Sequence, residues 1–258
     1  MDVLIGHTGF VGGLLARQRR FDACLASPSI GLLRGASVRH LVCAGVSAVK
    51  WKANREPEAD FAAIARLWEV LETVRAERVT LISTIDVLDD PAGASDEGAP
   101  ATGATGAYGR NRRWLEMRVE ERFSASLVLR LPALFGAGLK KNALYDMAHR
   151  NLVEKVHPEA WFQWYDVAWL SSDIDRAWAV GLPLAHLFPE PLRTGAIRDA
   201  FFPGLEIGAD VVGQPAPRYA AGTRHAGAFG HGGQGPFLAD AGVCMGRIGM
   251  FLRQERWA

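Results

Sequence analysis

Gly6-His7-Thr8-Gly9-Phe10-Val11-Gly12 lies directly after the apolar run Val3 to Ile5 and directly before a helix expected at Leu14 to Arg19. In such a strand-turn-helix unit the first glycine permits a tight turn, and the second lets backbone N–H groups approach a pyrophosphate. The third allows close packing of the helix on the strand. The amino end of the helix adds its positive dipole. The stretch predicts dinucleotide binding; the alternative is a glycine-rich turn without a ligand.

The rest of the first half alternates short apolar runs with helix-period segments. The clearest helix is expected from about Glu58 to Arg75, where apolar residues recur every three or four positions. Its stripe consists of Phe61, Ile64, Leu67, Trp68, Leu71 and Val74. The further strands are expected at Phe21 to Ala26, His40 to Ala44, Val79 to Ser83 and Leu127 to Leu131. The pattern predicts an α/β fold: a Rossmann-like, doubly wound parallel sheet.

The spacing also predicts how the chain is divided. Between Gly12 and His40 there is room for only one helix, one strand and a helical turn near 30–33, so we expect a sheet trimmed in its first half. A dinucleotide-binding domain is expected at residues 1–136 and a smaller, mainly substrate-binding lobe at 137–258, with segments near 161–190 returning to the first domain. Residues 89–107 form either a linker or a loop over a site. The aromatic run from Trp161 to Trp169 is expected to be core; the alternative is a stacking platform.

Composition excludes several classes of protein. The 258 residues are 49% hydrophobic and 22% charged, which excludes a disordered, collagen-like or coiled-coil chain. A net charge of +1 argues against an electrostatic grip on nucleic acid or anionic lipid. No apolar run reaches the ~18 residues of a membrane span. The start of the chain lacks a basic leader, so we do not expect secretion.

Two further residue types bear on the setting. Cys24, Cys43 and Cys244 stand far apart, which predicts buried thiols in a reducing compartment, and hence a cytoplasmic protein. His225 and His231 flank a glycine run with no acid or cysteine close by, so no metal site is predicted.

The second strand lacks the acid that often binds the ribose hydroxyls of NAD. After Asp22 the next acid is Glu56, while Ser27 and Arg34 lie where a 2′-phosphate would sit. This favours NADP slightly, the alternative being that Arg34 is a plain surface residue. The predicted cofactor is therefore NAD or NADP.

A second motif is Tyr108-Gly109-Arg110-Asn111-Arg112, which opens a helix continuing through Phe123. Tyr108 and Arg112 share the face that carries Leu115 and Val119, so both are expected to point inward. A cation beside a phenol, whose ordinary pKa is about 10, makes it a usable proton donor or acceptor near neutrality. The alternative is a cation–π pair at a helix start.

Two strand ends complete the pattern. Leu81-Ile82-Ser83-Thr84-Ile85-Asp86-Val87 places the hydroxyl of Thr84 at the carboxyl edge of a strand, where open α/β sheets bind ligands. Leu129-Arg130-Leu131-Pro132-Ala133-Leu134-Phe135-Gly136 follows the tyrosine helix. With the glycine pattern, these stretches resemble the extended short-chain dehydrogenases/reductases of the NAD-dependent epimerase/dehydratase group, which act largely on nucleotide sugars. The resemblance spans nearly the whole chain, including 163–167 and 190–193, and is most specific in the first half.

The resemblance implies four catalytic residues. Thr84 would hydrogen-bond the reacting oxygen of the substrate, Tyr108 would pass its proton, and Arg112 stands in place of the family lysine. That lysine holds the nicotinamide ribose and lowers the tyrosine pKa; arginine supplies charge but has a larger, planar head. Ile85 and Asp86 stand where the dehydratases carry an acid pair, so reduction, oxidation or epimerisation is favoured over dehydration. The alternative is that Asp86 is only a turn acid.

The resemblance also implies the binding residues. Contacts with the cofactor are expected from Gly6, Thr8, Gly9, Phe10, Val11, Gly12, Ser27, Cys43, Ala44, Gly45, Tyr108, Arg112 and Leu131. The diphosphate of a substrate is expected at Lys140, Lys141, Asn142 and Arg193; the alternative is that these are surface residues.

The sequence thus predicts an NAD(P)-dependent oxidoreductase or epimerase acting on a nucleotide sugar or a similar hydroxy or keto substrate. The alternative is a catalytically weak or inactive dinucleotide-binding protein with a regulatory or interaction role. The resemblance further implies a homodimer that pairs through the helices near 58–75 and 108–123.

Overall fold

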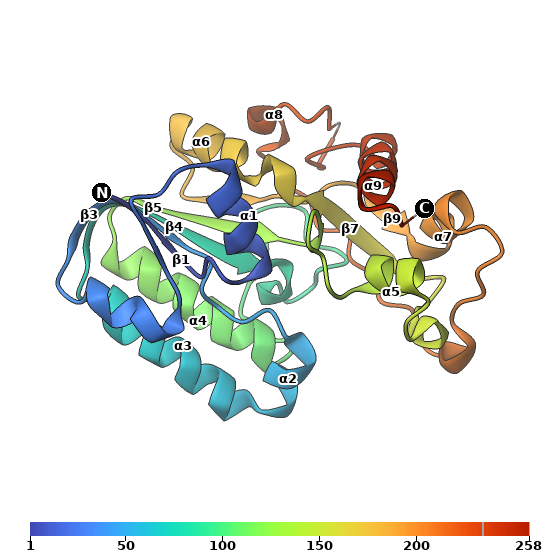
Figure 1. The fold of residues 1–258 in the computed structure, drawn as a ribbon, viewed down its shortest axis with the longest axis horizontal. Coiled ribbons are helices and arrows are strands. Elements are labelled where there is room, and N and C mark those ends of the chain that lie inside the picture. Colours follow the sequence, from blue (N-terminus) through green and yellow to red (C-terminus); the bar gives the residue numbers. More distant parts are fainter. Residues whose placement is uncertain (234, 258) are drawn as a thin grey trace. The chain divides into compact units, whose positions relative to one another are not determined.

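The computed structural model describes residues 1–233 and 235–257, which form two compact units. The first unit comprises residues 1–90, 97–131 and 168–186, and the second comprises residues 91–96, 132–167 and 187–258. Figure 1 shows both units with their elements labelled.

The first unit contains a six-stranded parallel sheet with the order β2-β1-β3-β4-β5-β8. Its strands are β1 (Asp2–Ile5), β2 (Ala23–Leu25), β3 (Ser37–Cys43), β4 (Arg75–Thr84), β5 (Ser126–Leu131) and β8 (Leu184–His186). Its helices are α1 (Phe10–Gln18), α2 (Lys50–Arg55), α3 (Pro57–Leu71), α4 (Ala107–Arg122) and α6 (Leu170–Ala179), with the short turns η1 (Ser27–Leu33), η2 (Ile85–Val87) and η4 (Val167–Trp169). The predicted Rossmann-like fold is confirmed.

The sheet is covered on both faces, with α3 and α4 on one side and α1 and α6 on the other (Figure 1). Alternate residues of the strands, such as Val3, Leu41 and Leu81, pack with Leu71 and Val119 in one buried cluster. The chain order reverses between β1 and β3, and the β2 side has one strand fewer than the common doubly wound sheet. This missing strand corresponds to the shortened first half of the sheet that the sequence predicts.

Several predicted boundaries and burials are wrong in detail. Helix α1 begins at Phe10, directly after the glycine turn, and α3 ends at Leu71 rather than Arg75. The reason for the early end is that Arg75 already pairs with β3 as the first residue of β4, which leaves Val74 in the turn. Phe61 is 38% exposed despite its place on the apolar stripe. Cys24 is exposed, because β2 is the edge strand of the sheet.

The second unit contains a three-stranded sheet with the order β6-β7-β9, in which β7 pairs parallel to β6 and antiparallel to β9. The strands are β6 (Ala133–Phe135), β7 (Trp161–Asp166) and β9 (Pro191–Arg193). The remaining elements are α5 (Ala143–His149), η3 (Val153–Lys155), α7 (Thr194–Phe201), η5 (Ala209–Val211), α8 (Ala226–Phe229) and α9 (Ala241–Glu255). Trp164 and Tyr165 are buried, as the prediction of an aromatic core requires.

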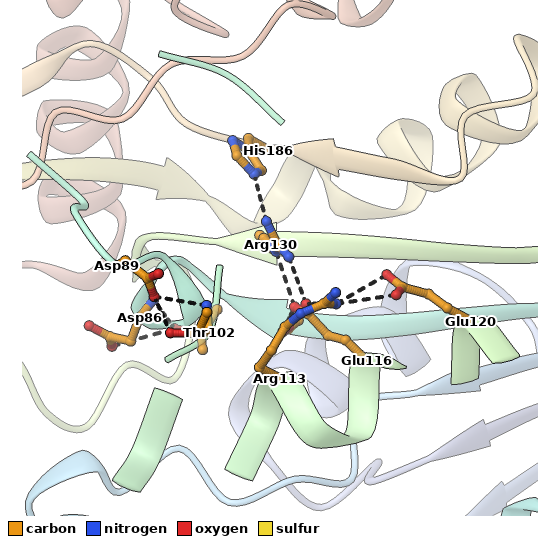
Figure 2. Close-up of polar contacts among 10 residues, drawn as sticks. Asp86, Asp89, Thr102, Arg113, Glu116, Glu120, Arg130 and His186 are labelled. Atoms are coloured by element: carbon orange, nitrogen blue, oxygen red, sulfur yellow. Dashed lines mark hydrogen bonds and ion pairs between the residues drawn. The ribbon is translucent and has the colours of Figure 1, made fainter. Parts of the chain in front are cut away.

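The segment 89–107 is a loop whose two parts belong to different units: 91–96 to the second, and 97–106 to the first. Within the first unit, Asp89 closes the loop through one carboxylate oxygen. That oxygen accepts hydrogen bonds from the backbone N–H of Thr102 at 2.8 Å and from its hydroxyl at 2.7 Å (Figure 2). The loop therefore returns to the strand end from which it left, directly before α4.

Candidate functional site

The glycine turn has the geometry that its sequence predicts. Gly6 adopts φ +90°, and a side chain there would collide with the carbonyl of Ala44. A side chain at Gly12 would collide with the carbonyl of Gly6, so the third glycine lets α1 pack tightly on the turn. Gly9 is the N-cap of α1 and offers no side-chain cap. The first-turn N–H groups, at Phe10, Val11 and Gly12, therefore point out of the helix without a capping side chain.

The other residues expected around a cofactor lie at the same edge of the sheet. The N–H of Gly6 donates to the Leu25 carbonyl at 2.7 Å, and the N–H of Ala44 donates to the Ile5 carbonyl at 2.9 Å, so neighbouring strand ends are tied together. Ser27, Gly45 and Leu131 also stand at carboxyl ends of strands or just beyond them. The edge between β1 and β3 is the reversal point of the sheet, where open α/β folds bind ligands.

Cys43 has the buried thiol that the sequence predicts, whereas Arg34 does not lie where the sequence suggests. The thiol of Cys43 is buried, and desolvation raises its pKa to about 11. Arg34 precedes β3 and donates to the Glu69 carbonyl at 3.2 Å, which places it at the amino edge of the sheet. The suggestion that Arg34 meets a 2′-phosphate is therefore wrong, because η1 carries the chain from Ser27 to the opposite edge.

Tyr108 and Arg112 are both buried on the inner face of α4. The guanidinium carbon of Arg112 lies 3.7 Å from the centre of the Tyr108 ring. The same guanidinium forms a two-pronged ion pair with Asp60 of α3, at 2.7 and 3.0 Å, and donates to the Ser47 carbonyl at 2.5 Å. The charge of Arg112 is thus balanced within the protein. No pattern in the sequence pairs Asp60 with Arg112, since the two residues lie on different helices.

Tyr108 is not brought towards neutral titration in this structure. Burial raises the pKa of its phenol above the ordinary value, and the charge of Asp86 adds to the increase. The positive charge of Arg112 and hydrogen bonds from Arg112 and Thr84 lower the pKa without offsetting burial. In this structure burial therefore opposes the lowering of the phenol pKa that is expected from the adjacent arginine, and Arg112 is shared with Asp60.

The tyrosine and the loop after β4 are held together closely. Gly109 has no side chain, and one there would collide with the Asp86 carbonyl, so the start of α4 packs directly on η2. Thr84 caps η2, its hydroxyl accepting from the N–H of Asp86 at 3.2 Å. Thr84 and Asp86, two positions apart, therefore share one site with Tyr108, which lies on the next helix of the chain.

Lys50 is a site residue that the sequence did not single out. Its ammonium donates to the Asp86 carboxylate at 2.7 Å, from the first residue of α2. The Asp86 side chain is 12% exposed, whereas that of Lys50 is 44% exposed. A lysine at the start of a short helix carries no recognisable signal, and only the adjacency of β3 and β4 in the sheet brings it to Asp86.

A second buried charged group lies beside the site (Figure 2). The carboxylate of Glu116 in α4 accepts two hydrogen bonds from Arg130 of β5, at 3.1 and 2.7 Å. It accepts a third from Arg113 at 2.9 Å. The hydroxyl of Ser83 donates to the same carboxylate. Arg130 also contacts the Nε2 of His186 at 3.2 Å; this nitrogen acts as acceptor, because a guanidinium only donates. These residues hold α4 on the sheet one position before Thr84.

The residues expected to bind a substrate lie in the second unit. Lys140 and Lys141 are exposed in the segment between β6 and α5. Asn142 caps α5 with its carbonyl oxygen and donates to the Leu134 carbonyl, so its amide has a structural task. Arg193 ends β9 and pairs with Glu159 at 2.7 Å.

Metal-binding clusters and membrane-spanning helices are two other features that would indicate a function. Within residues 1–233 and 235–257, no group of three or more His, Cys, Asp or Glu residues is arranged to hold a metal ion. Among the helices of the same residues, none combines the length and the apolar character needed to cross a membrane.

Comparison with known proteins places the fold. No protein-family model and no curated protein matches the sequence significantly. Solved structures do match. The dTDP-4-dehydrorhamnose reductase of Bacillus anthracis str. Ames, in complex with NADP, has a TM-score of 0.70 and 14% identity, covering 98% of this chain and 100% of its own.

Two further structures match over the full length. TunA, an NAD-dependent NDP-hexosamine 5,6-dehydratase involved in tunicamycin biosynthesis, has a TM-score of 0.70 and 17% identity, covering 100% of this chain and 98% of its own. MoeE5, in complex with UDP-glucuronic acid and NAD, has a TM-score of 0.70 and 15% identity, covering 99% of each chain. At such identities the likeness shows the fold alone.

Proposed function

We propose that the chain binds NAD or NADP, with the pyrophosphate on the glycine turn between β1 and α1. The turn fits this group: Gly9 leaves the first amides of α1 open, and Gly6 and Gly12 tolerate no side chain. The Nδ1 of His7, in the same turn, is buried without a hydrogen-bond partner among the described residues, and a ligand would supply one. The solved structures of like fold contain NADP or NAD.

We propose further that the protein is an oxidoreductase or epimerase acting on a nucleotide sugar. The bound cofactor supplies hydride exchange with a sugar carbon. Thr84 holds the reacting oxygen of the substrate, and Tyr108 gives it a proton or takes one from it. The observation that carries this proposal is the close packing of the start of α4 on η2, which places Tyr108 beside Thr84 and Asp86 at the carboxyl edge of the sheet. Ile85 leaves the site one carboxylate short of an acid pair, so reduction, oxidation or epimerisation is favoured over dehydration.

The remaining assignments follow from the same likeness. Lys140, Lys141 and Arg193 are proposed to meet the diphosphate of the substrate. We propose a cytoplasmic homodimer that pairs through α3 and α4, where Phe61 and Met117 are 38% and 45% exposed.

Calorimetry tests the cofactor site. Gly9→Asp should abolish binding of both NADPH and NADH, because a carboxylate at the mouth of the turn repels the pyrophosphate. The matched control is Gly242→Asp at the start of α9, where an added side chain meets nothing within 4 Å. A parent protein that binds neither cofactor would defeat the proposed function.

Turnover tests the catalytic assignment. With NADPH or NADH and a keto nucleotide sugar, Tyr108→Phe should lower kcat by about a hundredfold or more, because the variant loses its proton donor. Cofactor binding should be retained, since only a hydroxyl is removed. Equal rates for the variant and the parent would remove Tyr108 from the mechanism.

One observation favours a second function, a dinucleotide-binding protein with weak or no catalysis. Burial raises the pKa of Tyr108, and Asp60 neutralises the cation beside it. Arg112→Lys decides between the two functions, because a lysine cannot keep both hydrogen bonds to Asp60 and leaves a compact ammonium near the phenol. A rate that rises in the variant supports the enzyme. A variant and parent that both bind cofactor but show no turnover of a panel of nucleotide sugars support the binding protein.

A further inference from the structure

The starting observation is the ion pair between Lys50 and Asp86. Their 2.7 Å contact joins the start of α2 to η2. Asp86 is buried and Lys50 is half-exposed, so the lysine closes the solvent side of the carboxylate. A buried carboxylate of this kind needs a partner to remain charged at low cost.

Asp86 lies beside the residue that carries the proposed proton-transfer group. The Asp86 carboxylate accepts from the Thr84 hydroxyl at 3.5 Å, and the start of α4, which carries Tyr108, packs directly on the Asp86 backbone. Lys50, Asp86 and Thr84 are therefore joined side chain to side chain, and Tyr108 lies beside them at the start of α4.

The charges facing Tyr108 determine what Lys50 does. Arg112 lies over the ring and is paired with Asp60, so these two charges largely cancel. Asp86 is a second negative charge near the phenol, and it opposes the formation of a phenolate. Lys50 is the cation in direct contact with Asp86 and so offsets that opposition.

We propose that Lys50 is a positioning residue of this site, which holds Asp86 and balances its charge while Tyr108 is without its proton. Lys50 thereby supplies the positive charge near the phenol that the sequence led us to expect from Arg112. In the reducing direction the phenolic proton passes to the substrate oxygen as hydride arrives at the carbon, and the phenolate then takes a proton from water. The oxidising direction reverses both transfers. This inference rests on the proposed function, because only proton transfer makes a phenolate of Tyr108.

The test follows the phenol directly and requires no substrate. The protein has four tyrosines, so replacing them with 3-fluorotyrosine gives four fluorine resonances, of which Tyr108→Phe removes one. The fluorine also lowers the pKa of the phenol, which brings its titration within reach. Lys50→Met should move the Tyr108 titration to higher pH. Lys50→Arg should restore it, and Lys52→Met, a nearby exposed lysine paired with Glu56, should leave it unchanged.

A double-mutant cycle shows whether Lys50 acts through Asp86. Asp86→Asn should move the Tyr108 titration to lower pH, and adding Lys50→Met to Asp86→Asn should shift it less than in the parent. In a turnover assay Lys50→Met should lower kcat on the order of tenfold, with the pH profile of kcat displaced upward and little change in KM.

Two results would overturn the inference: a Lys50→Met protein that titrates as the parent does, or one whose shift is the same with and without the Asp86 carboxylate. Since Lys50 is half-exposed, the variant is expected to fold, and circular dichroism checks this. A third outcome separates the inference from the proposed function. If the Tyr108 titration shifts as expected but the protein shows no turnover, the proposed function is rejected, and Lys50 remains the residue that controls the electrostatic field at Tyr108.

Discussion

At the scale of single residues, the site shows what a one-dimensional pattern can and cannot give. The spacing of Tyr108 and Arg112 predicts that they share a helix face, and they do. The same spacing says nothing of Asp60, whose ion pair removes most of the charge that Arg112 was expected to offer. A motif therefore predicts which side chains meet along one element, whereas the effective charge depends on partners from other elements.

His40 is a residue whose titration should be visible in stability. Its Nε2 contacts the hydroxyl of Thr80 at 2.9 Å, and the indole of Trp178 donates to the same hydroxyl. Desolvation, followed by the charge of Arg19, lowers the pKa of His40 from 6.5 to about 4. The folded protein thus binds this proton less readily than the unfolded chain, so stability is complete above pH 6.5 and is lost as the pH falls towards 4.

Thermal unfolding between these pH values measures the effect. His40→Gln keeps a polar side chain without the titrating group, so its Tm should depend less on pH than that of the parent. Carboxylates elsewhere titrate in both proteins and cancel in the comparison. Parallel Tm curves would mean that His40 is protonated as easily in the folded state as in the unfolded state.

At the scale of elements, strand register explains the buried charges of Figure 2. Ser83 pairs with Arg130 and Arg130 pairs with His186, so three polar residues stand in one row across β4, β5 and β8. The carboxylate of Glu116, on α4, accepts hydrogen bonds from Arg130 and Ser83 of this row. The sequence motif contains Ser83 and Arg130, but their relation to Glu116 depends on a register that periodicity does not predict.

Removing the charge of Glu116 should therefore be costly. Glu116→Gln leaves the buried guanidinium of Arg130 without a counter-charge, and we expect the free energy of unfolding to fall by about 3 kcal/mol. The matched control is Glu120→Gln on the same helix, where a 37% exposed partner of Arg113 should contribute under ~1 kcal/mol. Urea unfolding measures both variants, and similar losses in the two would contradict a special role for the buried pair.

At the scale of the whole molecule, the fold was largely predictable and its boundaries were not. Five strands of the large sheet and the helix after the glycine turn follow from apolar runs and turn residues. The short strand β8 was missed, since three residues between helix and loop give too weak a pattern. The predicted helix extends beyond the end of α3, because the apolar period continues in the sequence whereas Arg75 already pairs with β3.

The proposed homodimer makes a prediction at this scale. Sedimentation should show a dimer in which Met117→Lys causes dissociation, since a charge on α4 would be buried at the contact. Met250→Lys on α9 is the matched control, because both methionines are 45% exposed. A monomeric parent, or a dimer indifferent to Met117→Lys, would reject pairing through α3 and α4.

The trimmed sheet has a consequence for how copies of the protein meet. Both of its outermost strands, β2 and β8, are only three residues long. A margin this short presents few unpaired backbone groups to an incoming strand, so it is a poor template for growth by edge-to-edge addition. The large sheet thus has two blunt margins, at β2, where the flanking strand is missing, and at β8, and both guard against strand pairing between molecules during folding at high concentration.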